Sequence, residues 1–285
     1  MLNREAVMTI TTLDGIFNAL ANNSSRLVID KASIANSAVG QVHSLWRATG
    51  QPGQGAIPAA AANCNNTLLG GFQYTQQTAP DTSYIGYFEA VCSSSSVTLE
   101  LHDRLIHRGG LVGNVATAQT AGVDLNGVTA DNMAERIGDV NFSDVQWFLE
   151  WYTDTGATVA TATVNVTYND GTTGNLTGIS LAATRRASFM QPLNGLIPAA
   201  NSGKFIRAVN TVTLSVSTGT AGNFGVTATR PRASLLCPVA NLKWSADWAA
   251  LPVSEIPNSS CLFMLQVAGS TSTGTIRGGG KLAHG

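Results

Sequence analysis

The residues with the clearest chemical potential lie in one short run, Leu101-His102-Asp103-Arg104-Leu105-Ile106-His107-Arg108. His102, Asp103 and His107 are residue types that bind metals, and either histidine could act as a local base. Two histidines five positions apart share a helix face less well than a pair at i and i+4. We therefore favour a strand end with solvated charges that leads into the Gly109-Gly110 turn.

The sequence lacks the short motifs of several common enzyme classes. It contains no G-x-S-x-G nucleophile elbow and no H-E-x-x-H zinc motif. Lys281 follows the run Gly278-Gly279-Gly280, but Leu282 stands where a phosphate-binding loop needs Ser or Thr. We expect this glycine run to be a flexible tail. The sequence predicts no enzymatic activity, no catalytic residue and no cofactor.

The four cysteines do not form a metal-binding or redox motif. No two of them make a C-x-x-C pair, which argues against a zinc ribbon. In a reducing cytoplasm they would be buried thiols, and the alternative is a single disulfide such as Cys237 with Cys261. The cysteines are Cys64, Cys92, Cys237 and Cys261.

Asp154 and Asp170, with neighbouring Asn and Thr oxygens, could bind Ca²⁺ in a loop of a β-sandwich. Hard cations need six or more oxygen ligands, and the sequence has no EF-hand spacing. Asp154-Thr155-Gly156 and Asn169-Asp170-Gly171 are explained more simply as turns. No metal site is predicted.

An aromatic strand, Gln146–Tyr152, carries two kinds of candidate. Trp147 and Trp151 are four positions apart, so in a strand they share one face. That face is either core, which we favour, or a platform for carbohydrate. Phe148 and Tyr152 lie on the opposite face, and we include them as candidate interface residues. If both faces are covered, the strand is central or lies between subunits.

Two further groups complete the candidate interface. Trp244 and Trp248 lie in a proline-punctuated segment that could dock aromatics onto a neighbour or simply cover the core. The basic residues that stand out are Arg185, Arg186, Arg230 and Arg232. They are expected to be solvated, with contacts to a neighbour's carboxylates or to nucleic acid as alternatives. We place Arg185 and Arg186 in the candidate interface.

The elements that must position these residues are mostly strands. Between 144 and 232, strand patterns follow one another at intervals of about 8–12 residues, without helices. Asn169-Asp170-Gly171 predicts a hairpin turn, and Phe224–Thr229 is expected to complete another hairpin with the strand before it. Further strands are expected over 84–92, 97–105, 261–267 and 275–277. The pattern predicts a mainly β fold, an antiparallel β-sandwich or jelly roll.

A short helical segment is expected at the N-terminus. Thr12 is an N-cap candidate before apolar residues at helical spacing, and a second helical pattern covers 34–46. We divide the chain into a helical N-terminal arm (1–55), a β-rich subdomain (56–143), a β-sandwich (144–235) and a C-terminal loop and strand tail (236–285).

Composition excludes several classes of protein. Only 12% of the 285 residues are charged, about half the usual share, and the net charge is −1. Such a chain has no global field for nucleic acid, and its 44% hydrophobic content argues against disorder. Neither a membrane-spanning apolar stretch nor the apolar core of a signal peptide is present. A neutral, hydroxyl-rich surface favours association between copies of the chain.

Four segments of the sequence resemble a group of tailed-bacteriophage virion structural proteins. The segments are 44–53, 103–111, 147–158 and 212–227. The resemblance spreads over most of the chain and includes no catalytic motif. It implies a capsid decoration or cement protein, in a virion assembled in the host cytoplasm. The implied partners are copies of itself and the major capsid protein or other virion proteins.

Several alternatives remain open on the sequence alone. The chain could be a tail-tube, minor capsid or fibre-like carbohydrate-binding virion protein. A depolymerase is a third class, which would require a pocket with paired carboxylates. Membrane is not an expected partner, and nucleic acid is an unlikely one.

Overall fold

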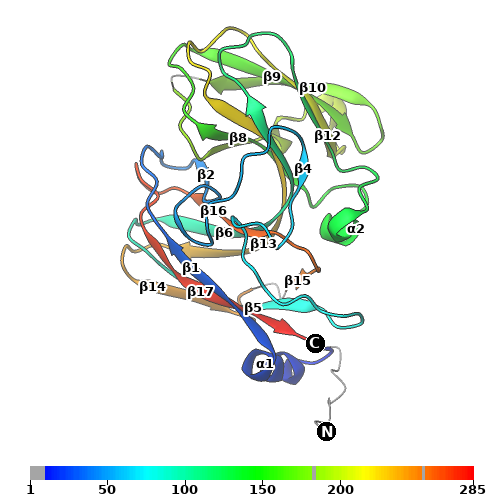
Figure 1. Cartoon of the computed structure of the whole chain (residues 1–285), viewed down its shortest axis with the longest axis vertical. Helices are drawn as coiled ribbons and strands as arrows, with labels where there is room; N and C mark the ends of the chain where they lie inside the picture. Colours follow the sequence, from blue (N-terminus) through cyan, green and yellow to red (C-terminus); the bar gives the residue numbers. More distant parts are fainter. Residues whose placement is uncertain (1–9, 182–183, 252–253) are drawn as a thin grey trace.

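The computed structural model describes residues 10–181, 184–251 and 254–285. They form three antiparallel sheets stacked along the long axis of the molecule (Figure 1). This arrangement confirms the predicted mainly β class. Because each sheet packs its apolar side chains against the next, the stack is a double sandwich with a shared middle layer.

The middle sheet has seven strands and closes on itself. Its order is β13 (Asn223–Cys237), β8 (Gln146–Thr153), β11 (Phe189–Pro192), β2 (Val42–Ser44), β16 (Leu262–Val267), β6 (Val97–Leu111) and β4 (Ala62–Asn63). β13 also pairs with β6, so six of the strands form a ring. Side chains that alternate along each strand therefore point into this closed sheet or out of it.

The two outer sheets are open. The lower sheet runs in the order β14 (Lys243–Asp247), β5 (Ser83–Cys92), β17 (Ile276–His284), β1 (Ser24–Lys31) and β3 (Gly50–Gln51), and β15 (Glu255–Ile256) pairs with β5. The upper sheet runs in the order β10 (Thr173–Leu181), β9 (Ala160–Tyr168), β12 (Ile206–Leu214) and β7 (Gln119–Asp124). In Figure 1 the upper sheet lies at the end opposite the C-terminus.

Two long strands connect the two outer cores. β6 and β13 pair along most of their length, and each contributes to both cores. In β6, Leu105 and Leu111 pack in the upper core, whereas Leu99 and Leu101 pack in the lower core. The pairing register shifts near the middle of the ladder, between Ala228 and Thr229 and again between Pro231 and Ala233. The polar run noticed in the sequence therefore lies at the junction of the two cores.

Helices are few and short. α1 (Leu13–Asn22) begins where predicted, and the Thr12 hydroxyl accepts a hydrogen bond from the Gly15 N–H at 3.1 Å. α2 covers Met133–Arg136, and single 3₁₀ turns cover Ala130–Asn132, Asn194–Leu196 and Ala199–Asn201. The second helix predicted over 34–46 is wrong. Residues 42–44 of this segment form β2, which pairs with β11 and β16, so strand pairing overrides the helical pattern.

The C-terminal glycine run is not the flexible tail that we expected. Gly278, Gly279 and Gly280 lie inside β17, between β1 and β5. A Cβ at Gly278 would lie 2.1 Å from the Glu89 carbonyl oxygen, so a residue without a side chain is required there. The described C-terminus is therefore built into the lower sheet.

The predicted strands are mostly confirmed, but one predicted hairpin is not. The turn at 169–171 joins β9 and β10, which pair as expected. β12 and β13 belong to different sheets, so 224–229 does not fold back on the strand before it. Strands from all four predicted segments share the middle sheet, which contains β2, β6, β8 and β16.

Candidate functional site

Residues 101–107 of the polar run are buried, which corrects the expectation of a solvated strand end. His102, Asp103, Arg104 and His107 all lie in β6 and are at most 3% exposed. They do not gather into one metal site, and the residues that the structure describes contain no cluster of three His, Cys, Asp or Glu suited to a metal ion. The charges instead divide into two clusters, one outside and one inside the closed sheet.

The first, which we call the seam cluster, consists of Asp103, Arg136 and Arg232. Asp103 accepts hydrogen bonds from Nε and Nη2 of Arg136 at 3.0 and 2.6 Å, and from Nη2 of Arg232 at 3.3 Å. Its Oδ1 also accepts from the Cys261 N–H. Burial raises the pKa of Asp103, but the charge and hydrogen bonds of Arg136, with Arg232, hold it below its usual value.

The second, which we call the interior cluster, consists of Arg104, His107, Glu150, Tyr152 and Thr227. Nη2 of Arg104 donates to Glu150 at 2.5 Å and to the Tyr152 hydroxyl at 2.9 Å. The Thr227 hydroxyl donates to the same Glu150 oxygen at 2.5 Å. Burial raises the pKa of Glu150, but the Arg104 charge and hydrogen bond lower it below its usual value.

Aromatic rings enclose the interior cluster. The guanidinium of Arg104 lies 4.5 Å from the centroid of the Trp46 ring and 5.0 Å from that of Phe263. None of the described cavities is lined by Arg104 or Glu150. The interior cluster is therefore a set of buried polar groups whose hydrogen bonds link β6, β8 and β13.

The aromatic residues of β8 are all inside the molecule. Trp147 and Trp151 are 0% and 1% exposed and pack in the upper core, which confirms the core interpretation and removes them as a carbohydrate platform. Phe148 and Tyr152 face the interior of the closed sheet and are 3% and 4% exposed. These two candidate interface residues are therefore unavailable to a neighbour, because both faces of β8 are covered within one chain.

The other candidate interface residues lie nearer the surface, at separate places. Trp244 is half-buried on edge strand β14, and Trp248 makes an edge-to-face contact with Phe17 of α1 at 5.3 Å. Arg186 is exposed and pairs with Asp154 at 2.7 Å. Arg185 lies 4.7 Å from the Phe189 ring centroid. The structure does not bring these four residues into one patch.

The remaining candidates from the sequence are a turn residue, a partner in an ion pair and four free thiols. Asp170 accepts from the backbone and hydroxyl of Thr172, as a turn residue does. Arg230 pairs with Asp144 at 3.2 Å. All four cysteines are free and buried, which confirms the thiol interpretation over the Cys237–Cys261 disulfide.

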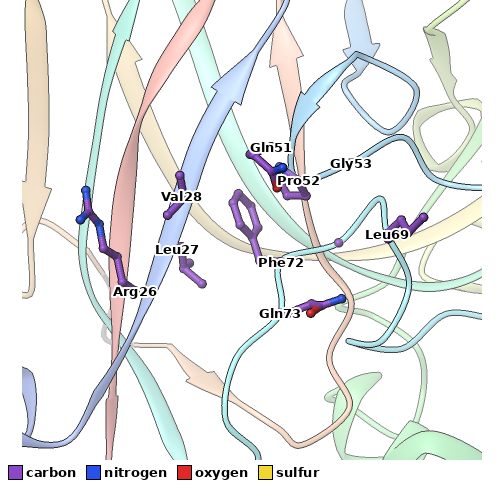
Figure 2. A pocket seen from close by; sticks show the side chains of 10 residues that line it. Arg26, Leu27, Val28, Gln51, Pro52, Gly53, Leu69, Phe72 and Gln73 are labelled. Atoms are coloured by element: carbon purple, nitrogen blue, oxygen red, sulfur yellow. The ribbon is translucent and has the colours of Figure 1, made fainter.

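Sequence reasoning missed a groove along the edge of β1, shown in Figure 2. It has a volume of about 350 Å³ and lies between β1 and two loop segments. We call it the edge groove. Its lining residues are Arg26, Leu27, Val28, Gln51, Pro52, Gly53, Leu69, Gly71, Phe72 and Gln73. The sequence signals here are the strand-like run Leu27-Val28-Ile29 and the glycines and proline after residue 49, but neither shows that a strand edge stays open.

A buried lysine fixes one wall of the edge groove. Lys31 is 2% exposed, and its ammonium donates to the carbonyl oxygens of Ala48 at 3.1 Å and Pro52 at 2.5 Å. No salt bridge of Lys31 is found among the described residues. Burial lowers its pKa from 10.5 to about 8. Lys31 therefore serves as a polar anchor that holds the loop after β3 against the end of β1.

Comparisons with known proteins give only distant structural likenesses. No known family model matches the chain, and no curated protein does. The VP2 subviral particle of infectious bursal disease virus is similar at 10% identity over 92% of this chain and 79% of that chain, with a TM-score of 0.19. T=1 particles derived from infectious bursal virus match at 11% identity over 92% and 77%, with a TM-score of 0.19. Likenesses this weak carry no argument about function.

No described helix has the length and apolar character needed to span a membrane. The longest, α1, has ten residues.

Proposed function

We propose that this chain is a non-enzymatic structural protein of a virus particle, and that it decorates the capsid of a tailed bacteriophage while associating with copies of itself. The distribution of charge is the observation that carries the proposal. Six charged residues are under 5% exposed: Lys31, Asp103, Arg104, Arg136, Glu150 and Arg232. The surface is therefore even poorer in charge than the composition suggests, which lowers the desolvation cost of burying it against other proteins.

Exposed apolar side chains support the same reading. Leu236, Val239 and Leu242 lie within seven residues, between the end of β13 and β14, and each is more than half exposed. These three large apolar side chains are accessible for contact with another protein. The resemblance to tailed-phage virion proteins supplies the particle type, with capsid and other virion proteins as partners and assembly in the host cytoplasm.

The absence of enzymatic activity is part of the proposal. Its support is that the strongly perturbed groups of the interior cluster are sealed behind Trp46 and Phe263, where a substrate has no access. The carbohydrate-binding alternative has lost Trp147 and Trp151, its main support.

Two measurements test the proposal. Particles purified from cells that encode this chain should contain it in many copies, and the copies should remain with heads when heads and tails are separated. Sedimentation of the purified chain between 1 and 100 µM should show reversible association. Copies that partition with tails would replace decoration by a tail-tube or fibre role. A chain that is absent from particles and strictly monomeric would overturn the proposal.

A further inference from the structure

The backbone of β1 is unpaired along the edge groove. The Asn23 carbonyl oxygen accepts from the His284 N–H, so odd-numbered residues direct their backbone groups toward β17. The Ala32 N–H donates in the opposite direction, to the Thr49 carbonyl oxygen at 3.0 Å. By alternation, the N–H and C=O groups of Arg26 and Val28 face away from β17. Among the described residues, β3 covers this side of β1 only at Asp30 and Lys31.

The edge groove lies directly against these unpaired groups. Arg26, Leu27 and Val28 form one side, and Leu69 and Gln73 lie across from them in Figure 2, with the Phe72 ring between. Leu27 and Phe72 are 1% and 3% exposed and belong to the lower core, so the floor is apolar. An open strand edge beside an apolar floor is the geometry that binds an added strand.

The chain carries one segment whose pattern fits this groove, Arg4-Glu5-Ala6-Val7-Met8-Thr9-Ile10-Thr11. Ala6, Met8 and Ile10 fall on one face of an extended strand and Glu5, Thr9 and Thr11 on the other, with Val7 as the one apolar exception, and four of the last five residues are β-branched. Residue 12, which follows, is extended, with φ −137° and ψ 159°. Glu5 is also complementary in charge to the exposed Arg26 of β1.

We propose that residues 4–11 of a second copy of this chain add as a strand to the open edge of β1. The inference rests on the proposed self-association and specifies its contact. Ala6, Met8 and Ile10 would lie on the floor formed by Leu27 and Phe72 and pack against the exposed Leu69, while backbone groups bond to Arg26 and Val28. A cavity of about 350 Å³ holds the inward side chains of a few residues, and the rest of the strand lies along the open side of the groove. Strand exchange of this kind also hides an edge that would otherwise promote aggregation.

Hydrogen exchange of the full chain tests the contact directly. The amides of Arg26 and Val28 should exchange at least tenfold more slowly at 100 µM than at 1 µM, because pairing requires a second copy. Leu27 and Ile29 bond to β17 within the chain, so their amides should be protected equally at both concentrations. A synthetic peptide of residues 4–11 should protect Val28 at low concentration and weaken association at high concentration.

A double variant, V7P/T9P, removes two backbone donors from the proposed strand, and V7T/T9V is the matched control that keeps them. The proline variant should weaken association at least tenfold, and the control should associate like the wild type. Two outcomes overturn the strand exchange and leave the proposed function standing. In one, the chain associates but the Val28 amide exchanges at the same rate at both concentrations. In the other, V7P/T9P and V7T/T9V associate equally well. Protection of Val28 that is independent of concentration also overturns the strand exchange, because the segment would then bind its own chain. A chain that is monomeric throughout overturns self-association itself.

Discussion

Asp103 and Arg136 form a two-point ion pair in which neither side chain has any exposed surface. Arg232 binds the same carboxylate, so one negative charge is shared by two buried guanidinium groups. A buried pair of this kind contributes little beyond what apolar residues would, but removing one partner leaves an uncompensated charge. The seam cluster is therefore a point where a small chemical change has a large effect.

The substitution Asp103→Asn should be strongly destabilising. It removes the charge that Arg136 and Arg232 share and should lower the free energy of unfolding by about 3–5 kcal/mol. The exposed pair of Asp154 and Arg186 provides the control, and Asp154→Asn should cost under about 1 kcal/mol. Urea denaturation followed by fluorescence measures both. If Asp103→Asn and Asp154→Asn lower the free energy of unfolding equally, the burial of the seam cluster does not determine the cost of losing its carboxylate.

Stability should fall in acid, because the pKa values of Asp103 and Glu150 are lowered by folding. A carboxyl with a depressed folded-state pKa stabilises the protein above its unfolded pKa and loses that contribution as the pH falls through the folded value. The ordinary values are 3.8 for Asp and 4.5 for Glu. Burial also lowers the pKa of His43 from 6.5 to about 4, so the unfolded chain binds this proton at a higher pH than the folded chain. The free energy of unfolding should therefore begin to fall below about pH 6.5 and drop further below about 4, where the two carboxylates gain protons.

The variant Glu150→Gln checks the origin of this acid sensitivity. It should be less stable than the wild type at pH 7, and the difference should shrink as the pH falls below about 4, where the wild-type carboxylate gains a proton. Denaturation curves at a series of pH values give the comparison. If the difference in free energy of unfolding between the wild type and Glu150→Gln is the same at every pH, then protonation of Glu150 does not cause the loss of stability in acid.

The sequence predicted the strands better than it predicted their partners. Alternation along Val97–Leu101 and the turn at 169–171 are local signals, and both were confirmed. The assignment of β12 and β13 to different sheets depends on contacts between distant residues, so adjacency in the chain misled the hairpin prediction. The glycines of β17 look like a flexible tail until β1 and β5 are placed on either side.

The burial of the charged residues could not be predicted from local pattern. His102, Asp103 and Arg104 resemble a solvated strand end because polar residues are usually exposed. Their partners, Arg136, Glu150 and Arg232, are between 32 and 129 positions away in the chain. The closing of the middle sheet and the packing of α2 beside β6 bring them together, and local sequence pattern carries no signal of either.

Lys31 should make stability rise in alkaline solution. Its pKa is about 8 in the folded chain and 10.5 as the ordinary value, so between these values the unfolded chain binds more protons. A base with a lowered pKa then adds stability as the pH rises. Relative to Lys31→Met, which cannot titrate, the wild type should gain on the order of 1–3 kcal/mol between pH 8 and 10.5.

Denaturation of both proteins across this range measures the gain. Lys243, which is exposed and pairs with Glu89, is the matched position, and Lys243→Met should leave the alkaline rise in place. If the free energies of unfolding of the wild type and Lys31→Met change in parallel with pH, the pKa of the buried Lys31 ammonium is the same in the folded and unfolded chains.

Gly50, which directly precedes the edge-groove residue Gln51, should be harder to replace than Gly40. Its φ of +117° is unfavourable for other residues, and a Cβ there would lie 1.7 Å from the Asp30 carbonyl oxygen. Gly40 also has a positive φ, +77°, but a Cβ there meets nothing within 4 Å. Gly40→Ala should therefore show only backbone strain, on the order of 1–3 kcal/mol, and Gly50→Ala should cost more. The clash in Gly50→Ala should separate β3 from β1, so the Ala32 amide should lose its protection from hydrogen exchange in this variant and keep it in Gly40→Ala. Equal protection of the Ala32 amide in the two variants would mean that the pairing of β3 with β1 does not depend on this close approach.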